Sequence, residues 1–370
     1  MTRPLIPLYL GIFSIMALSN AIVPGLATYA PGTALQGQIF SAYFFGAFLL
    51  TLPAGILADR YGPGLLVKAG LSLTVISGLI LLATPAVYLL ILARCIEGVG
   101  AGLFIASAMS YVNSQENHIR ISGIFMAVLN IGLVSGLIIT GWVYLETGYR
   151  DAGFYIFTLV SIISLTSVVF ARFGEAPNRE QVSRNPPLVP RLVSGVRRYF
   201  WLWFSSVVLV GITGAVTALY PQFSGTGPEI IALQVAAMNA ATAVIVIVIS
   251  RIGFAPIPTI RITAIASAFA VIAAFFTPFS FLLIGALAGI VMIAQMAFLA
   301  DAGPEQGIYM GLFNTSSYLG MSLLPFIAGF VAESLGFFSA FLFIALCSVA
   351  VAATIGLCGE CELRKVCPPP

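Results

Sequence analysis

The stretch GILADRYGPG, residues Gly55 to Gly64, closes an apolar run with the pair Asp59-Arg60 and continues with Gly, Pro and Gly. Charge is scarce in this chain, because only 8% of its 370 residues are charged whereas 60% are hydrophobic. Soluble domains are about 45 to 50% apolar, so a fold surrounded by water would lack a polar surface. With a mean hydropathy of +1.06, the sequence predicts a protein whose solvent is the bilayer, and the charged stretch marks the end of a membrane span.

The apolar stretches have the length of membrane-spanning helices, since about 20 mainly apolar residues cross roughly 30 Å of hydrocarbon. We expect twelve spans, at residues 5–28, 37–58, 64–84, 87–111, 120–142, 149–171, 198–220, 229–250, 257–276, 279–299, 306–329 and 335–357. The first could instead be a secretory signal, but its apolar part is too long and another full span follows, so a retained helix is favoured. The expected fold class is an all-α integral membrane protein with twelve transmembrane helices.

The positive charges test this topology. All sixteen Lys and Arg residues but two fall in or beside segments on the side of the N-terminus; Arg150 is expected on the other side and Arg94 inside a span. Cytoplasmic loops carry the excess of Lys and Arg. We therefore expect a multi-pass protein of the cell (plasma) membrane with both termini cytoplasmic.

The longest polar segment, ARFGEAPNREQVSRNPPLVPRLVSGVRR at residues 171–198, is rich in Pro, Arg and Asn and separates six spans from six. Such a composition is typical of a linker. We expect an N-terminal bundle at 1–171, a cytoplasmic linker at 172–197, a C-terminal bundle at 198–357 and a cytoplasmic tail at 358–370.

An internal repeat supports the two bundles. GIFMAVLNIGLVSGLIITGWVYLETG (Gly123 to Gly148) aligns without gaps with GLFNTSSYLGMSLLPFIAGFVAESLG (Gly311 to Gly336), and four glycines share the register. The opening stretch has a weaker echo, ISRIGFA at residues 249–255, in which Ser250 replaces Asp59. The repeats predict two pseudo-symmetric six-helix bundles.

The opening stretch resembles the loop signature of the major facilitator superfamily of secondary transporters, with matching residues at Gly55, Leu57, Ala58, Asp59, Arg60 and Gly62. RCIEGVG resembles a second signature of that family, with Arg94, Gly98 and Gly100 in place and Glu97 where Gln is common. The basic continuation of the first signature is displaced to Lys68, and the Gly-Pro of the antiporter signature is absent, since the chain reads Ser135-Gly136. The resemblance covers essentially the whole chain and implies a transporter that works by alternating access.

The resemblance also implies a cytoplasmic gate formed by Gly55, Asp59, Arg60 and Gly62. A carboxylate at the end of helix two can face the positive N-terminal end of helix eleven and hold the bundles together on the inside. The alternative is a helix end-cap and topology anchor with no role in transport.

Arg94 and Glu97 stand three residues apart, on nearly the same face of helix four. Arg94 lies on the order of 12 Å into its span, at about 1.5 Å per residue, where an Arg costs about 2.5 to 3.5 kcal/mol. It therefore needs a partner or water. The pair is either a structural tether of the N-terminal bundle or a coupling and substrate site.

Uncharged polar residues elsewhere in the spans could face a central cavity. The candidates are Asn20, Asn130, Gln234, Asn239, Gln295, Asn314 and Tyr318. Hydrogen bonding between helices is the competing role for each of them. The C-terminal half of such a cavity would be neutral, with Phe, Tyr and Met abundant.

The sequence offers little for chemistry beyond transport. Its single His is His118, and HExxH, GxSxG and Walker motifs are absent. Cys358, Cys361 and Cys367 in the tail would be reduced in the cytoplasm and are interpreted as incidental, although metal binding or lipidation is the alternative. We expect no catalytic residues, no metal and no cofactor.

These observations favour a secondary active transporter of a small molecule, proton-coupled and leaning to export of amphipathic compounds. The alternatives are an uptake symporter of a small organic anion that pairs with Arg94, and a non-transporting receptor on the same fold. Expected partners are the substrate, protons and the lipid bilayer, with no nucleic acid, and the expected state is a monomer. A fold does not name a substrate.

Overall fold

A computed structural model describes residues 5–83, 86–113, 115, 118–171, 173, 188–249, 254–300 and 306–357 of the chain. In these ranges twelve helical stretches are long and apolar enough to cross a membrane, which confirms the predicted number. The elements of the first half are α1 (Leu5–Asn20), η1 (Val23–Gly25), α2 (Leu26–Tyr29), α3 (Thr33–Tyr61), α4 (Pro63–Ala83), α5 (Val87–Asn113), α6 (His118–Thr147) and α7 (Ala152–Phe170). Those of the second half are α9 (Leu188–Arg198), α10 (Phe200–Ser224), α11 (Pro228–Ile249), α12 (Pro256–Phe276), α13 (Ser280–Ala300), α14 (Gln306–Leu335), α15 (Phe337–Thr354) and η2 (Ile355–Leu357).

The first span is not a single helix. Helix α1 ends at Asn20, and the tighter turn η1 and the short helix α2 complete the crossing. Pro24 lies in the first turn of η1. Proline has no N–H to donate and its ring clashes with the preceding turn, which favours a break in the α-helix at this point. The expected span at 5–28 therefore has the right extent but is broken near its end.

The expected linker at 172–197 contains a helix, α9, that the composition did not suggest. A Cβ added at Gly195 of this helix would lie 3.2 Å from the Tyr309 ring of α14. The indole N–H of Trp203, in α10, donates a hydrogen bond of 3.1 Å to the Gly195 carbonyl. Exposed Val193 and Arg197 lie on the other sides of the helix. Helix α9 is thus amphipathic and is attached to the second bundle.

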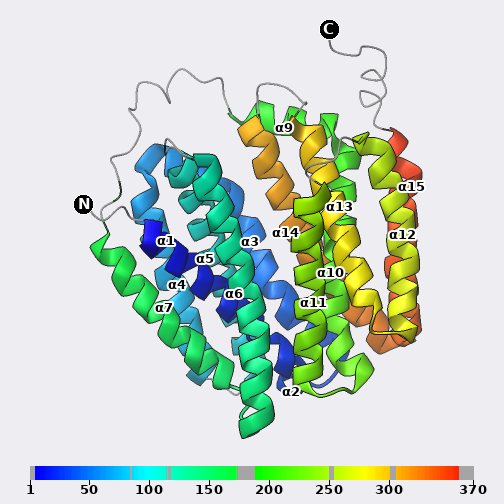
Figure 1. Ribbon diagram of the computed structural model, residues 1–370, viewed down its shortest axis with the longest axis horizontal. Helices are drawn as coiled ribbons and strands as arrows, with labels where there is room; N and C mark the ends of the chain where they lie inside the picture. Colours follow the sequence, from blue (N-terminus) through cyan, green and yellow to red (C-terminus); the bar gives the residue numbers. More distant parts are fainter. Residues whose placement is uncertain are drawn as a thin grey trace.

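The spans form two bundles, α1 to α7 and α10 to α15, which lie side by side in Figure 1 with α9 above the second bundle. We call the end that carries α9, where α1 begins and α3 finishes, the linker end, and the opposite end the far end. The described residues contain helices and turns and no strand. In a bilayer this is expected, because every backbone polar group of a span must be satisfied internally.

Glycines set how closely the helices of each bundle approach. In the first bundle a Cβ added at Gly98 of α5 would overlap the Tyr43 carbonyl oxygen of α3. In the second bundle a Cβ at Gly285 of α13 would overlap the Met238 carbonyl oxygen of α11. Small residues allow such backbone contacts between helices in membranes. Since the two contacts involve the second and fourth spans of each bundle, they are related by the internal repeat.

The repeated glycines that predicted the duplication also lie in equivalent places. Gly132 of α6 packs on Phe13 of α1, whose carbonyl oxygen is 2.7 Å from an added Cβ. Gly320 of α14 packs in the same way on Val207 of α10. The fifth span therefore contacts the first span of its bundle as the eleventh contacts the seventh, and the pseudo-symmetric arrangement is confirmed.

The two bundles touch at the far end, and along α3 and α14 the contact continues as far as Leu52, whose Cδ1 lies 3.1 Å from a Cβ added at Gly311; beyond these residues, toward the linker end, space opens. On α3, a Cβ at Gly37 would lie 2.6 Å from the Pro325 carbonyl oxygen of α14, whereas a Cβ at Gly55 has nothing within 4 Å. On α6, a Cβ at Gly141 would lie 2.6 Å from Ala232 of α11, whereas Gly123 again has nothing within 4 Å. Eighteen residues separate each pair, which is five helical turns and hence the same helix face.

We expect Gly98→Ala to destabilise the protein, because the added methyl group meets a backbone carbonyl that cannot move without shifting α3. Overpacking of this kind costs about 1 to 3 kcal/mol. The free energy of unfolding, measured by SDS titration in mixed micelles, should fall by that amount. Gly123→Ala is the matched control, since its methyl group points into open space, and it should leave stability unchanged or raise it. Equal effects of the two substitutions would contradict the packing argument.

Candidate functional site

Arg94 and Glu97 form an ion pair within α5, with 2.6 Å between Arg94 Nη1 and Glu97 Oε2. Both side chains are buried, with exposed fractions of 1% for Arg94 and 0% for Glu97. Their spacing of three residues places them one above the other on the helix. The partner that Arg94 requires inside the membrane is therefore Glu97.

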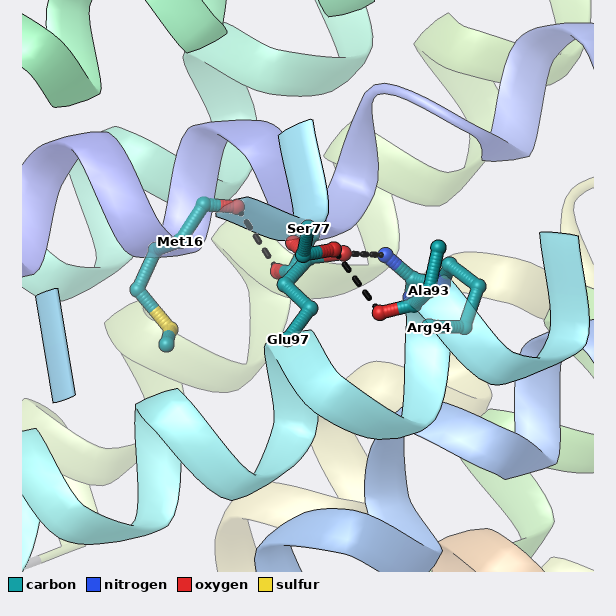
Figure 2. Close-up of polar contacts among 6 residues, drawn as sticks. Met16, Ser77, Ala93, Arg94 and Glu97 are labelled. Carbon is teal, nitrogen blue, oxygen red and sulfur yellow. Dashed lines mark hydrogen bonds and ion pairs between the residues drawn. The ribbon is translucent and has the colours of Figure 1, made fainter. Parts of the chain in front are cut away.

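The pair is enclosed by three other helices of the first bundle. The guanidinium carbon of Arg94 lies 4.8 Å from the centre of the Tyr43 ring of α3, within the range of a cation–π interaction. In Figure 2 Glu97 lies beside Ser77 of α4, with Met16 of α1 on one side and Arg94 on the other. The Ser77 hydroxyl donates to the Ala93 carbonyl at 2.7 Å. Residues from α1, α3 and α4 thus fix the segment of α5 that carries the ion pair.

Polar atoms of the pair remain without a protein partner. Arg94 Nε and Glu97 Oε1 are buried and make no hydrogen bond within the described residues. A buried polar atom without a partner is unfavourable unless water, a proton or a ligand group satisfies it. Glu97 Oε1 can accept a hydrogen bond or a proton, and Arg94 Nε can donate one. Each side chain of the pair therefore keeps one polar atom that is available to another group.

The second bundle has no such pair at the equivalent positions. When Gly98 is aligned with Gly285, Arg94 aligns with Phe281 and Glu97 aligns with Ile284. Phe281 and Ile284 are buried, 1% and 3% exposed. The repeat has kept the glycine contact and replaced the charges with apolar side chains, so the ionisable centre is confined to the first bundle.

Two of the expected cavity residues, Asn130 and Asn239, lie on the faces that α6 and α11 turn toward each other. Asn130 is eleven residues, or about three turns, before Gly141, and Asn239 is seven residues, or about two turns, after Ala232. Gly141 and Ala232 are in contact. Asn130 and Asn239 are half-buried, and both amides lie toward the linker end of this contact, where the bundles separate.

The other inter-bundle face, between α3 and α14, carries Tyr318 and Asn314. The Tyr318 ring stacks on Phe44 of α3, with centroids 6.3 Å apart and planes 29° apart. Asn314 is eleven residues before Pro325, so it shares the face that contacts Gly37, and its side chain is exposed. Aromatic and amide groups without formal charge therefore lie on the faces where the two bundles meet.

The remaining candidates lie within or between helices of one bundle. The Asn20 side-chain amide donates to the Leu133 carbonyl of α6 at 3.2 Å, and the Gln295 side-chain amide donates to the Ser205 hydroxyl at 2.9 Å. Gln295 is fully buried. Gln234 is half-buried and its Oε1 has no partner in the described residues.

The signature around Asp59 is described in part. Gly62 caps the end of α3 with a φ of +85° and its N–H donates to the Ala58 carbonyl at 2.9 Å. A left-handed φ favours glycine, which explains the family's Gly at this position. The side chains of Asp59 and Arg60 lie outside the described residues, so the gate contact stays a prediction. The cysteines of the tail lie outside them as well, and the described ranges hold no cluster of metal-ligating side chains.

Sequence reasoning missed a set of polar residues that join the bundles at the far end. Thr33 and Gln36 of α3 bond to Gly329 of α14 and Gln222 of α10, and Glu333 of α14 accepts a hydrogen bond from α3. Glu333 follows Gly329 by one turn on the repeated glycine face. This glycine repeat could have indicated that Glu333 lies on a helix-packing face, but the repeat does not identify the helix that the face contacts.

We expect Arg94→Ala to destabilise the protein strongly, because it leaves the Glu97 carboxylate buried without its partner. Breaking a buried pair in this way costs about 3 to 5 kcal/mol. The double substitution Arg94→Met/Glu97→Leu removes both charges at similar volume and should restore most of the loss in free energy of unfolding. A double variant as unstable as Arg94→Ala would show that the pair stabilises the bundle in its own right.

The comparisons with known proteins agree with this architecture. The sequence model of the Major Facilitator Superfamily matches residues 6–323. An uncharacterized transporter of Buchnera aphidicola subsp. Schizaphis graminum is 29% identical over 48% of this chain and 44% of its own length. The quinolone resistance protein NorA of Staphylococcus aureus is 23% identical over 57% of this chain and 54% of its own length. The chain thus spans about half the length of these curated relatives.

Solved structures match over nearly the whole chain. The nucleoside transporter NupG has a TM-score of 0.76 at 15% identity, covering 96% of this chain and 100% of NupG. A bacterial homologue of the human lysosomal transporter Spinster, in an inward-facing and occupied conformation, has a TM-score of 0.74 at 15% identity and covers 100% of both chains. At this identity the likeness concerns the fold alone. The family match over most of the chain, together with the twelve membrane-spanning helices, shows that the protein is a multi-pass membrane protein that belongs to the major facilitator superfamily.

Proposed function

We propose that the protein exports amphipathic small molecules by proton-coupled alternating access. The observation that carries this proposal is the pair of inter-bundle faces, which are in contact at the far end and meet open space at Gly55 and Gly123 toward the linker end. Those faces present Tyr318, Asn130, Asn239 and Asn314, which bear no formal charge. An uncharged aromatic lining favours a substrate with apolar surface and a few hydrogen-bonding groups.

The distribution of charges supports a linker end on the cytoplasmic side of the plasma membrane. A monomer is proposed as well. Described basic residues at the linker end are Lys68, Arg120, Arg191, Arg197, Arg198 and Arg261, and described acidic residues at the far end are Glu146, Asp151, Glu229 and Glu333. Arg150 is the described basic residue at the far end. Under the positive-inside rule the protein then faces inward, with both termini cytoplasmic.

The direction of transport draws on a relative. NorA is named for quinolone resistance, a property that export of a drug would give. An inward-facing exporter accepts an amphipathic compound from the cytoplasm or the inner leaflet. The separated linker end of the two bundles provides that access.

Coupling to protons is assigned to the Arg94–Glu97 pair. Arg stays charged at physiological pH, so Glu97 carries the titrating group. Protonation of Glu97 removes the charge that holds Arg94, and frees the guanidinium to move against Tyr43 or to bind another group. Because α3 carries both Tyr43 and the gate stretch, a change at the pair can be transmitted to the contact of α3 with α14.

We expect Glu97→Gln to abolish substrate accumulation driven by a pH gradient and to leave substrate exchange partly intact, because the amide cannot carry the proton. Arg94→Ala should impair both. The measurement is uptake and exchange in proteoliposomes over a series of imposed pH gradients. Gln295→Leu, which removes a buried amide of the second bundle without adding a titratable group, is the control for a changed buried side chain. Wild-type accumulation and pH dependence in Glu97→Gln would show that the pair is structural and the proton site lies elsewhere.

The gate assigned to the opening stretch is a second part of this proposal. Asp59 would approach residues 305–309 at the start of α14 when the linker end closes, and attract the positive N-terminal end of that helix. Gly55, on the same α3 face as Gly37, faces open space in this conformation, which is consistent with an unlatched gate.

Asp59→Asn should keep the fold and shift the population toward the inward-open conformation. Labelling of a cysteine at position 314, in a variant without native cysteines, should become faster by about tenfold, the effect of losing one charge at a helix terminus. Glu146→Gln, which neutralises an acid at the far end, should have no effect. An unchanged labelling rate in Asp59→Asn would count against the gate.

The second candidate is uptake of a small organic anion, favoured by the unused donor of Arg94. If small carboxylates inhibit proton-driven transport, and if this inhibition is lost in Arg94→Lys, anion uptake is favoured over export of neutral or cationic amphiphiles. Ligand binding without counterflow in proteoliposomes would instead indicate a receptor.

A further inference from the structure

The far-end contact between α3 and α14 contains a helix cap supplied by the other bundle. The backbone N–H of Ala34, in the first turn of α3, donates a hydrogen bond of 2.9 Å to Oε2 of Glu333, in the last turn of α14. These residues are 299 positions apart in sequence. The contact therefore exists only when the two bundles are together at the far end.

Helix α3 has no cap of its own. Its N-cap residue is Gly32, which has no side chain to accept from the first N–H groups, and whose φ is +84°. The first four N–H groups of a helix lack partners inside it, and together they carry a partial positive charge. Glu333 supplies both the acceptor and the negative charge. A Cβ at Gly32 would lie 2.8 Å from Glu333 Oε2, so the missing side chain also makes room for the carboxylate.

Neighbouring contacts bring the carboxylate into place. The Thr33 hydroxyl donates to the Gly329 carbonyl at 3.0 Å, one turn from Glu333. A Cβ at Gly329 would lie 2.6 Å from the Thr33 carbonyl oxygen. The Gln36 side-chain amide donates to both the Ala30 carbonyl, at 3.0 Å, and Gln222 of α10. Helices α3 and α14 thus approach by backbone contact, and Glu333 bonds at the outer edge of that contact.

We propose that Glu333 is a gating residue, a carboxylate latch that holds the far end closed by capping α3 from the opposite bundle. The proposal rests on the alternating access proposed above. Asp59 and Glu333 belong to opposite ends of the same helix pair. Asp59 lies at the end of α3 and would face the start of α14, whereas Glu333 lies at the end of α14 and caps the start of α3. A rocking motion makes one contact as it breaks the other, so the two carboxylates stabilise opposite conformations.

The position of Glu333 suits a contact that forms and breaks. Its side chain is exposed, so water can solvate the carboxylate and the freed N–H groups of α3 when the bundles part. The buried pair Arg94–Glu97 has no such access and cannot separate without a partner. The latch therefore contributes a modest, reversible bias toward far-end closure.

The test measures the two conformations directly by pulsed electron paramagnetic resonance in nanodiscs. Spin labels at positions 88 and 279 report on the far end, and labels at 65 and 262 report on the linker end; the native side chains at these four positions are 66 to 82% exposed. Glu333→Ala and Glu333→Gln should raise the ratio of the far-end-open to the far-end-closed population by about two- to fivefold, the factor expected from the loss of one exposed charge at a helix terminus. The linker-end distance should shorten in the same molecules.

Two further variants make the result specific. Glu146→Ala removes an exposed carboxylate at the far end, on α6, and should leave both distance distributions unchanged. Gly329→Ala adds a methyl group against the Thr33 carbonyl and should open the far end as Glu333→Ala does, without changing any charge.

Unchanged distributions in both Glu333 variants would overturn the latch, and so would an equal shift in Glu146→Ala. These outcomes are separate from the proposed function, which is tested by transport in the wild-type protein. If the wild-type protein transports substrate while the Glu333 variants populate the wild-type conformations, the latch is wrong and the transporter stands. If the wild-type protein binds ligand without counterflow, the proposed transport fails whatever the distances show.

Discussion

The approach of α3 to α14 holds the two bundles in their observed relation, and it depends on glycine. Gly37 and Gly329 bring backbone against backbone at the far end, because lipid offers helices no hydrophobic reason to associate and close van der Waals contact must replace it. Once that contact is made, Thr33 and Glu333 reach their partners across the bundles. Five turns away, Gly55 has no neighbour. The same helix pair is therefore in contact from the far end to Leu52 and Gly311, and its last turns at the linker end are available for a further contact.

The interior chemistry is divided unequally between two bundles that are packed alike. Gly98 and Gly285 make corresponding contacts, yet the first bundle buries an ion pair where the second buries Phe281 and Ile284. A buried ion pair is rarely the most stable choice for a helix contact, since apolar residues of similar volume serve as well. Its retention in one bundle is easier to understand as a functional requirement, and the unpartnered atoms of Arg94 and Glu97 agree with that view.

The polar groups of the molecule fall into three settings with different roles. Asn20 and Gln295 bond to neighbouring helices and contribute to packing. Asn130, Asn239 and Asn314 lie on the inter-bundle faces and bear no formal charge themselves, and these faces are where a substrate would be held between the bundles. Glu333 lies at the rim, where water competes for its carboxylate, so its contact is the easiest of the three to exchange during a conformational change.

The sequence by itself determined the fold class, the number of spans, the duplication and the family, because each depends on local composition or on residues repeated at fixed spacing. It also identified the Arg94–Glu97 pair, since two ionisable residues one helical turn apart must meet wherever the helix lies. It did not determine the break near Pro24, the helix α9, or which polar residues face the other bundle. These depend on how each helix is rotated and which neighbour it meets. Glu333 shows the difference most clearly: its partner is a backbone N–H of α3, a group that every residue except proline carries, so no sequence pattern marks it and only the tertiary structure selects it.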